Sequence, residues 1–151
     1  MAIFEYPFYD KGVTLSPHVP IIITNPIENI SIAVYALLDT GADDSVFTNY
    51  IADATWHNLK GDGVQNSITQ GVGAGHVETW KHTFTITLLS PNKNTKIWRS
   101  ENSLISCVDH DLMPPILGFT EFLSKFKITF DYNCNKIIIE IPDDQLINEP
   151  Y

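Results

Sequence analysis

The residues best placed to do chemistry lie around Asp39, where an apolar stretch ends in Asp39-Thr40-Gly41. A carboxylate that a buried strand delivers into a turn can give or take a proton, and a glycine favours such a turn. Alone, Asp-Thr-Gly is a short motif that also occurs by chance in turns. A second apolar pair that ends in glycine, Ile116-Leu117-Gly118, follows much later in the chain. The two segments together, rather than the tripeptide, single out this part of the sequence.

Short strands are the elements expected to position these residues. From Ile30 to Leu38, apolar residues alternate with others, which predicts a strand that ends at Asp39. A short helical stretch is expected at 48–59, with Thr48 as N-cap, and one or two helical turns at 120–125. The pattern predicts an all-β fold, a small barrel or closed sandwich with one short helix late in the chain. The other expected strands are 19–24, 64–71, 76–80, 83–88, 96–98, 103–108, 127–132 and 136–141.

Length and composition limit the function further. The 151 residues, 44% hydrophobic and 18% charged, suit one globular domain with its own core but not two complete lobes. Eighteen acidic residues against nine basic ones, with Arg99 the single arginine, argue against binding to nucleic acid. Residues 1–7 lack the features of a signal peptide, and no apolar run is long enough to span a membrane. We therefore expect a cytoplasmic protein.

These segments resemble the retropepsins, the single-lobe aspartic proteases that include the retroviral proteases and their cellular relatives. Residues 38–46 are similar to the family's active-site loop almost letter for letter, and residues 116–122 to its second motif and C-terminal helix. The glycine-rich segment 71–75 lies between them, where the family has the tip of its flap hairpin. The resemblance covers about residues 19–141, and residues 123–131 are more similar to cellular and bacterial members than to viral ones.

The resemblance implies a fold and a set of roles. The fold would be a small closed barrel of the retropepsin type, with a glycine-rich flap hairpin and one short C-terminal helix. Asp39 would be the catalytic carboxylate, Thr40 would brace the loop against a partner chain, and Gly41 would donate its amide to the carboxylates. No metal or organic cofactor is implied. The substrate would contact residues of the loop, the flap and the walls, namely Ala42, Asp43, Asp44, Val72, Gly73, Ala74, Ile116 and Leu117.

Peptide hydrolysis by an activated water needs one group that takes a proton and another that gives one. Two carboxylates held close together share a proton and split their apparent pKa values, so an identical pair supplies both groups. The sequence holds one Asp-Thr-Gly, and the pattern does not recur at Asp53, Asp62 or Asp131. The second carboxylate must then come from another copy of Asp39, across the axis of a homodimer.

Two features depart from the viral pattern. Viral members follow the glycine of the second motif with an arginine that pairs with an acidic residue of the active-site loop. Here Phe119 and Thr120 follow, so Asp43 is expected to lack that partner. Beyond the core at about 19–141, the domain (1–151) has an N-terminal arm, 1–18, and an acidic tail, 142–151, that is loose or used in assembly. Aromatic side chains of the arm could cross a dimer interface or anchor the arm on its own barrel: Tyr6, Phe8 and Tyr9.

Other polar and aromatic residues carry less weight. Asp109-His110-Asp111 has metal-binding residue types, but neighbours in a loop point in different directions, so we expect a solvated loop. We expect the two cysteines to be reduced and partly buried. The histidines lack the spacing of metal ligands. The tryptophans are expected to anchor a core or an interface. A Ser-His-Asp triad stays open, although no Gly-x-Ser-x-Gly elbow is present. These residues are Cys107, Cys134, His18, His57, His76, His82, Trp56, Trp80 and Trp98.

The sequence therefore predicts an aspartic endopeptidase, active as a homodimer, that acts on a protein or peptide in extended conformation. Neither nucleic acid nor a membrane is an expected partner. The alternative is a dimeric peptide-binding or assembly module that keeps the barrel but has little or no activity.

Overall fold

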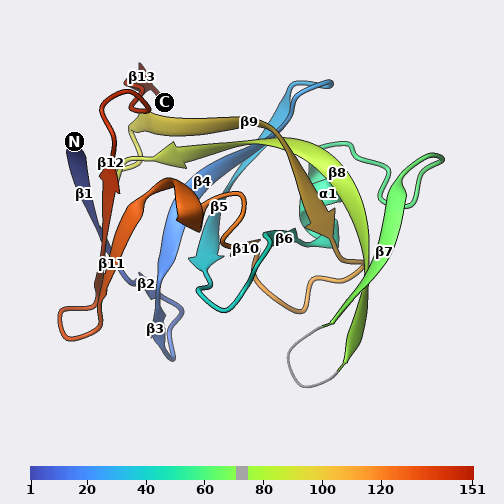
Figure 1. The fold of residues 1–151 in the computed structure, drawn as a ribbon, viewed down its shortest axis with the longest axis horizontal. Coiled ribbons are helices and arrows are strands. Elements are labelled where there is room, and N and C mark those ends of the chain that lie inside the picture. The colour runs from blue at the N-terminus through green and yellow to red at the C-terminus, as the bar shows by residue number, and fades with distance from the viewer. Residues whose placement is uncertain (71–74) are drawn as a thin grey trace.

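The computed structural model describes residues 1–70 and 75–151, and most of them are in strands (Figure 1). The strands are β1 (Ala2–Pro7), β2 (Tyr9–Asp10), β3 (Leu15–Ser16), β4 (His18–Asn25), β5 (Ile30–Leu38), β6 (Val46–Phe47), β7 (Gln65–Gln70), β8 (His76–Leu89), β9 (Thr95–Cys107), β10 (Ile116–Leu117), β11 (Lys127–Asp131), β12 (Lys136–Ile141) and β13 (Glu149–Pro150). The helices are α1 (Asn49–Ala54) and the 3₁₀ turn η1 (Leu123–Lys125). The all-β prediction is confirmed.

The main sheet closes on itself. Its eight strands run in the order β13-β9-β6-β10-β5-β4-β8-β7, and an additional pairing of β8 with β9 joins the two sides into a ring. A second sheet, in the order β1-β12-β11, lies beside it (Figure 1). Alternate side chains of the ring strands fill its interior, so that Ile21, Ile23, Phe84, Ile86 and Ile105 are fully buried. Each such side chain contributes about 1.5–3 kcal/mol of burial free energy.

The strand that leads to Asp39 has the predicted bounds, Ile30–Leu38. Elsewhere the sequence predicts two strands where the structure has one. The single strand β8 covers the predicted strands 76–80 and 83–88, and β9 covers most of the predicted strands 96–98 and 103–108. These two strands pair with each other along most of their length, with register shifts between Phe84 and Ile86 and between Leu88 and Leu89. Such shifts let a long strand bend without breaking. One end of β8 can therefore pair with β4 while the other pairs with β7.

The two expected helical stretches are both shorter than predicted. The first is α1, which Thr48 precedes as N-cap without a side-chain capping bond. The second is reduced to η1 and the turns before it. Packing rather than helix propensity holds this second segment, because Phe122 is fully buried and meets Trp98 and Phe126 edge to face at 5.5 and 5.0 Å between ring centroids.

The N-terminal arm is anchored on its own barrel. Strand β1 pairs with β12 from Ala2 to Pro7. The ring of Tyr6 is 2% exposed, and its hydroxyl donates to the Leu89 carbonyl at 2.7 Å. Phe8 is also buried, and Tyr9 stacks on Tyr35 at 4.4 Å between ring centroids. The sequence left open whether these aromatic side chains cross a dimer interface or anchor the arm on its own barrel, and in the structure they anchor the arm.

The tail is not loose, whereas its use in assembly stays a prediction. After Pro142 the tail returns to the main sheet, where β13 pairs with the edge of β9 and the Ile147 N–H donates to the Ile97 carbonyl at 3.0 Å. Arg99 bonds the Glu149 carboxylate at 2.6 Å, and this bond lowers the pKa of Glu149 from its ordinary value. The free edge of β9 and the cationic Arg99 thus supply the partners that the acidic tail needs.

The cysteines and tryptophans divide between core and surface. Cys107 is buried, Cys134 is exposed, and both are free thiols. Burial raises the pKa of the Cys107 thiol to about 12, so this group stays protonated. Trp80 and Trp98 lie in the core, but Trp56 is 70% exposed. The prediction of a core position is therefore wrong for Trp56. The chain turns at this residue, just after α1, with a positive φ of 62°.

Three of these histidines, His18, His57 and His82, lie within hydrogen-bond distance of polar groups. His57 Nε2 lies 3.0 Å from the Thr83 carbonyl, and His82 Nε2 lies 2.9 Å from the Leu59 carbonyl. His18 Nδ1 lies 2.7 Å from the Ser16 hydroxyl, and His76 is exposed.

Within residues 1–70 and 75–151, no helix has the length and apolar character needed to cross a membrane.

The anchored arm predicts the effect of removing one hydroxyl. Tyr6→Phe deletes the buried bond to the Leu89 carbonyl and keeps the ring, so we expect the free energy of unfolding to fall by about 1–2 kcal/mol. Denaturant unfolding at a fixed protein concentration measures this loss. The matched control is Tyr132→Phe, because Tyr132 is 67% exposed and should lose less than about 0.5 kcal/mol. Equal losses in both variants would contradict the anchoring role of the Tyr6 hydroxyl.

Candidate active site

The two motifs of the sequence meet in the middle of the main sheet. Strand β10 lies between β5 and β6, parallel to β5 with Leu117 opposite Leu38, and antiparallel to β6 with Ile116 opposite Val46. The Asp39 N–H donates to the Leu117 carbonyl at 3.2 Å. Leu38 and Leu117 are buried, so the apolar character of both segments brings them to the same place. Asp39 therefore begins the loop at the point where these two strands end.

The carboxylate of Asp39 is held by its own loop. Its Oδ1 accepts the Gly41 N–H at 2.9 Å, and its carbonyl accepts the Ala42 N–H at 3.1 Å. The residue is only partly buried, so its carboxylate stays within reach of water. Gly41 does not have a positive φ. Its contribution here is therefore the amide, and the amide donation to the carboxylate is present within the chain.

Residues 118–120 fasten the loop through a set of hydrogen bonds that we call the loop clamp. Each bond joins a residue of the second motif to a residue of the Asp39 loop; two join backbone to backbone, and two join a backbone group to a side-chain hydroxyl. Because both segments are short, these bonds replace the longer ladders that hold ordinary strands. The bonds are Gly118 N–H to Ser45 Oγ (2.9 Å), Phe119 N–H to Ala42 O (3.0 Å), Thr120 N–H to Asp43 O (2.9 Å) and Thr120 Oγ1–H to Asp43 O (2.9 Å).

The narrow space around position 118 admits no side chain. A Cβ atom at this position would lie 2.5 Å from the carbonyl carbon of Asp44 and 2.6 Å from its oxygen. These are backbone atoms, which cannot move away as the end of a flexible side chain could. The close approach of the two segments, and with it the loop clamp, therefore depends on glycine here.

Sequence analysis missed two residues of this region, Ser45 and Glu121. The Ser45 residue is fully buried, and its N–H donates to both carboxylate oxygens of Glu121, at 3.1 and 3.2 Å. Burial, followed by the charge of Asp44, raises the pKa of Glu121. The signal in the sequence is a carboxylate directly before Phe122, at the start of a packed segment where an apolar residue would be ordinary.

The predicted substrate-contacting residues have different surroundings. Asp43 and Asp44 are exposed, as is Thr40, while Ala42 and Ile116 are partly buried. Leu117, by contrast, is fully buried, and its carbonyl accepts the Asp39 N–H. The expected flap residues Val72, Gly73 and Ala74 lie outside the described residues. The two arms of the expected hairpin are β7 and β8, which pair from Gln65–Lys81 to Gln70–His76.

Asp43 contacts Thr120 of the second motif. The contact runs through the Asp43 backbone carbonyl, which accepts both the N–H and the hydroxyl of Thr120. Among the described residues, no ion pair involves the Asp43 carboxylate. Thr120 thus keeps the second motif attached to the loop while the Asp43 carboxylate stays exposed.

The side chains of the Asp109-His110-Asp111 segment each have a different partner. Asp109 bonds Lys60 at 2.5 Å, Asp111 accepts the Tyr50 N–H at 2.7 Å, and His110 accepts the Leu112 N–H at 3.2 Å. Across the described part of the chain, no group of three or more His, Cys, Asp or Glu side chains is arranged to hold a metal ion.

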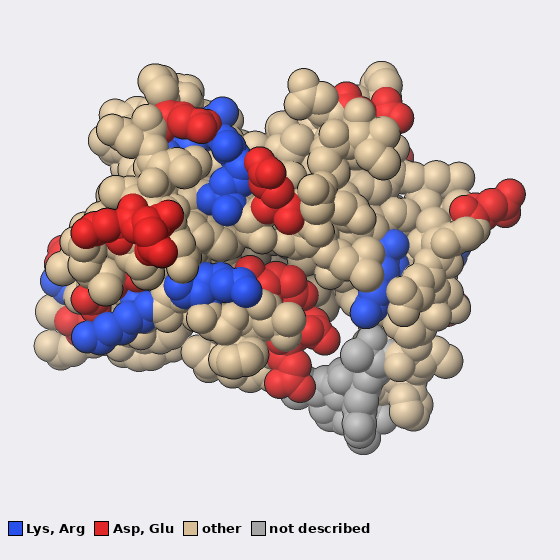
Figure 2. Space-filling view, turned by 45° about the horizontal axis from the view of Figure 1, so that its top comes forward, with Lys and Arg blue, Asp and Glu red and all other residues tan. Residues whose placement is uncertain are grey.

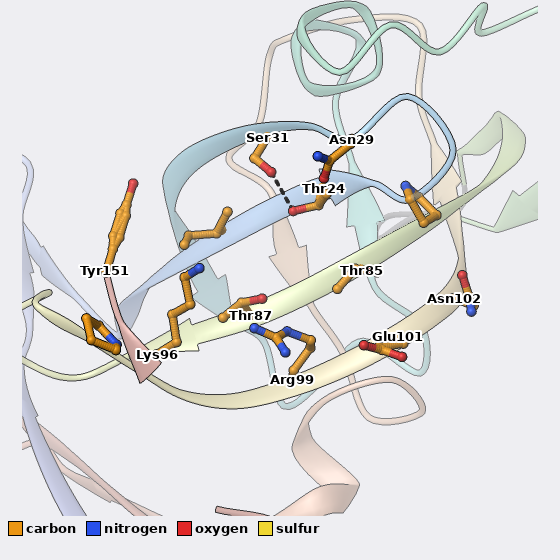
Figure 3. Close-up of a pocket in the computed structure, with 13 residues that line it drawn as sticks. Thr24, Asn29, Ser31, Thr85, Thr87, Lys96, Arg99, Glu101, Asn102 and Tyr151 are labelled. Atoms are coloured by element: carbon orange, nitrogen blue, oxygen red, sulfur yellow. Dashed lines mark hydrogen bonds between the residues drawn. The ribbon is translucent and has the colours of Figure 1, made fainter. Parts of the chain in front are cut away.

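Two cavities help to locate the chemistry. One of about 740 Å³ lies over the outward-facing side chains of β4, β5, β8 and β9, away from Asp39 (Figure 3). It holds hydroxyl groups, such as the bonded pair Thr24 and Ser31 at 2.6 Å, and Arg99, which Glu149 already neutralises. A smaller cavity of about 350 Å³ is lined by Asp44 of the Asp39 loop and by Glu121, which follows the second motif. Figure 2 also shows a hollow on one face, with acidic side chains gathered beside it.

The fold matches solved structures of aspartic proteases. A retropepsin-like aspartic protease from Rickettsia conorii matches with a TM-score of 0.57 and 17% sequence identity, over 99% of this chain and 94% of that one. The fold is retropepsin-like. The retroviral protease-like domain of Ddi1 from Leishmania major matches with a TM-score of 0.50 and 18% identity, over 91% of this chain and 96% of that one. No protein-family model matches the sequence, and no curated protein gives a significant match.

The predicted retropepsin-like fold is thus confirmed, with its two motifs side by side. At identities of 17% and 18%, the likeness extends to the fold, and the role of each residue rests on its own surroundings. Those surroundings place a partly buried carboxylate on a loop that a second segment clamps from below. Such a group can exchange protons with a bound water.

The space around Gly118 leads to a test of the loop clamp. Gly118→Ala places a methyl group against the Asp44 backbone, so we expect a loss of about 3 kcal/mol in the free energy of unfolding. The matched control is Gly41→Ala, because its Cβ would lie 3.4 Å from Asp39 Oδ1, an ordinary contact, and should lose about 1 kcal/mol or less. Denaturant unfolding compares the two. A Gly118 variant as stable as the Gly41 variant would show that the two segments can separate freely.

Proposed function

We propose that this protein is an aspartic endopeptidase, which hydrolyses peptide bonds through an activated water in a site shared by two copies of the chain. The observation that carries the proposal is the setting of Asp39. It stands at the paired ends of β5 and β10 in a retropepsin-like fold, partly buried, with Oδ1 fixed by the Gly41 amide. A fixed carboxylate that water can reach is what this chemistry requires.

The two Asp39 carboxylates of a dimer would act as one unit. Two carboxylates at hydrogen-bond distance cannot both ionise, so one holds the proton that the other lacks. The ionised carboxylate takes a proton from the water as it attacks the peptide carbonyl carbon, and the protonated one donates to the carbonyl oxygen. As the resulting tetrahedral intermediate collapses, the C–N bond breaks, the proton taken from the water passes to the leaving amine, and the other carboxylate regains its proton from the intermediate's hydroxyl. The apparent pKa values belong to the pair. Thr40, which is exposed beside Asp39, would brace the loop against the partner chain, and Gly41 would hold the carboxylate.

The substrate would lie extended over the Asp39 loop, between it and the hairpin of β7 and β8. Ala42, Asp43 and Asp44 would contact its main chain, as an added strand does. The carbonyls of Ala42 and Asp43 already accept the N–H groups of residues 119 and 120. We therefore expect the exposed side chains of Asp43 and Asp44 to be the loop groups most open to a substrate.

The remaining substrate contacts come from the walls and the flap. Ile116 would offer an apolar wall and favour apolar residues beside the scissile bond. The flap residues Val72, Gly73 and Ala74 would close over the substrate and keep bulk water out. The reaction as proposed draws on no metal or organic cofactor.

Substitution of Asp39 tests the chemistry. The purified protein should cleave a denatured protein substrate at some pH between about 3 and 7. Asp39→Asn should abolish this cleavage, because at these pH values an amide acts neither as a general base nor as a general acid. The matched control is Asp53→Asn, an exposed aspartate of α1 that should leave cleavage unchanged. Product formation by mass spectrometry measures both. Cleavage that survives in Asp39→Asn would sink the mechanism, and peptide binding without cleavage at any pH would favour the inactive binding module.

Mixing wild-type and Asp39→Asn chains tests the shared site. If each site needs one Asp39 from each copy, an equimolar mixture that has exchanged subunits should keep about one quarter of the all-wild-type rate, since mixed dimers are inactive. Independent sites would keep about half. The rates are measured at one total protein concentration, after incubation long enough for exchange. A mixture that keeps half the rate, with exchange shown by labelled chains, would contradict the shared site.

A further inference from the structure

Glu121 is the one carboxylate of this region that the proposed chemistry leaves without a role. It lies near the end of the second motif, 76 positions from Ser45, yet both of its oxygens accept the Ser45 N–H. Ser45 is fully buried and uses its hydroxyl to accept the Gly118 N–H. Gly118 directly follows Leu117, whose carbonyl accepts the Asp39 N–H. A continuous set of contacts therefore runs from Glu121 to Asp39.

The surroundings of Glu121 are poor for a negative charge. The side chain is half-buried beside the cavity of about 350 Å³. The charged groups that face it there are Asp44 from the Asp39 loop, Lys81 from β8 and Lys125 from η1, and the rest of the lining is made of hydroxyl groups and Leu104. Among the described residues, neither lysine forms an ion pair with Glu121. The nearby Asp44 therefore repels the ionised form without a direct cationic partner to offset it.

We propose that Glu121 is a positioning residue for Asp39, whose carboxyl group holds the Ser45 amide and does so at lowest cost when it is neutral, so that mild acid strengthens the support of the loop. A neutral carboxyl group still accepts an N–H through its carbonyl oxygen. Protonation thus removes the repulsion from Asp44 and keeps the bond to Ser45. The catalytic part of this inference rests on the proposed function, whereas the part that concerns loop stability does not.

The direction of the pH effect follows from linkage. Burial and Asp44 raise the pKa of Glu121 above its value in the unfolded chain, even though the Ser45 N–H and Lys81 act in the opposite direction. The folded state then binds the proton more tightly than the unfolded state does. Through Glu121, stability is gained as the pH falls through the folded-state pKa towards the ordinary one, and lost as the pH rises through the same range.

Three variants separate the charge from the hydrogen bond. Glu121→Gln keeps an acceptor and never ionises, so at pH 7 it should be at least as stable as the wild type, and at pH 4 the difference should shrink. Glu121→Ala leaves the buried Ser45 N–H unpaired and should be less stable at both pH values. Glu28→Gln, at an exposed turn, is the matched control and should follow the wild type at both. Thermal unfolding at one protein concentration measures all of them.

Kinetics then test the link to Asp39. Glu121→Gln should keep its kcat to a higher pH than the wild type, and Glu121→Ala should lose at least about tenfold in kcat across the profile under conditions where it is folded, because a misplaced reactive group lowers the rate. A Gln variant that is as unstable as the Ala variant at pH 7 would overturn the neutral-acceptor role. Unchanged kcat profiles in both variants would overturn the positioning role. Should the wild type not cleave at all, the proposed function fails, while the unfolding data still decide the role of Glu121.

Discussion

Hydrogen bonds between residues 39–45 and 117–121 hold the centre of this fold. Strands β6 and β10 are two residues long, which is too short for a sheet ladder to secure them. Their buried N–H and C=O groups nevertheless need partners, because each unpaired group costs about 1–3 kcal/mol. The two segments satisfy each other instead, through the Asp39–Leu117 bond, the loop clamp and the Glu121–Ser45 contact. Asp39 can therefore stand on a short loop and still have a fixed position.

The rest of the structure serves this contact. Strands β5 and β4 pair over eight positions and bring the chain to Asp39 from a rigid element. The long pair of β8 and β9 closes the ring on the other side and pairs with β6 through β9. Below the second motif, Phe122 packs with Trp98 and Phe126, which holds residues 118–121 against the loop. Space is so limited there that only a glycine fits at position 118.

Local patterns in the sequence were enough to predict the elements that carry Asp39, but not the contacts that hold it. The alternation from Ile30 to Leu38 is set by one buried and one less buried face, so the strand and its end at Asp39 were predictable. The Ser45–Glu121 bond joins residues 76 positions apart, and periodicity has no information at that range. The same limit explains the tail, whose pairing with β9 depends on a free edge and on Arg99. The full burial of Leu117 was likewise beyond local patterns, because an apolar residue next to an active site can equally line the site or belong to the core.

Acidity connects the proposed dimer with the surroundings of Asp39. One chain carries a net charge of −9, so two copies bring about twice that charge together. Part of this charge lies beside the site, since Asp43 and Asp44 are exposed on the loop and Glu121 lies behind it. In the proposed dimer, a falling pH would reduce the repulsion between the copies, protonate the first member of the carboxylate pair and neutralise Glu121, and all three changes would favour the same assembled loop. In the proposed enzyme, one solution variable would therefore act on assembly, on the dyad and on the support of Asp39 in the same direction.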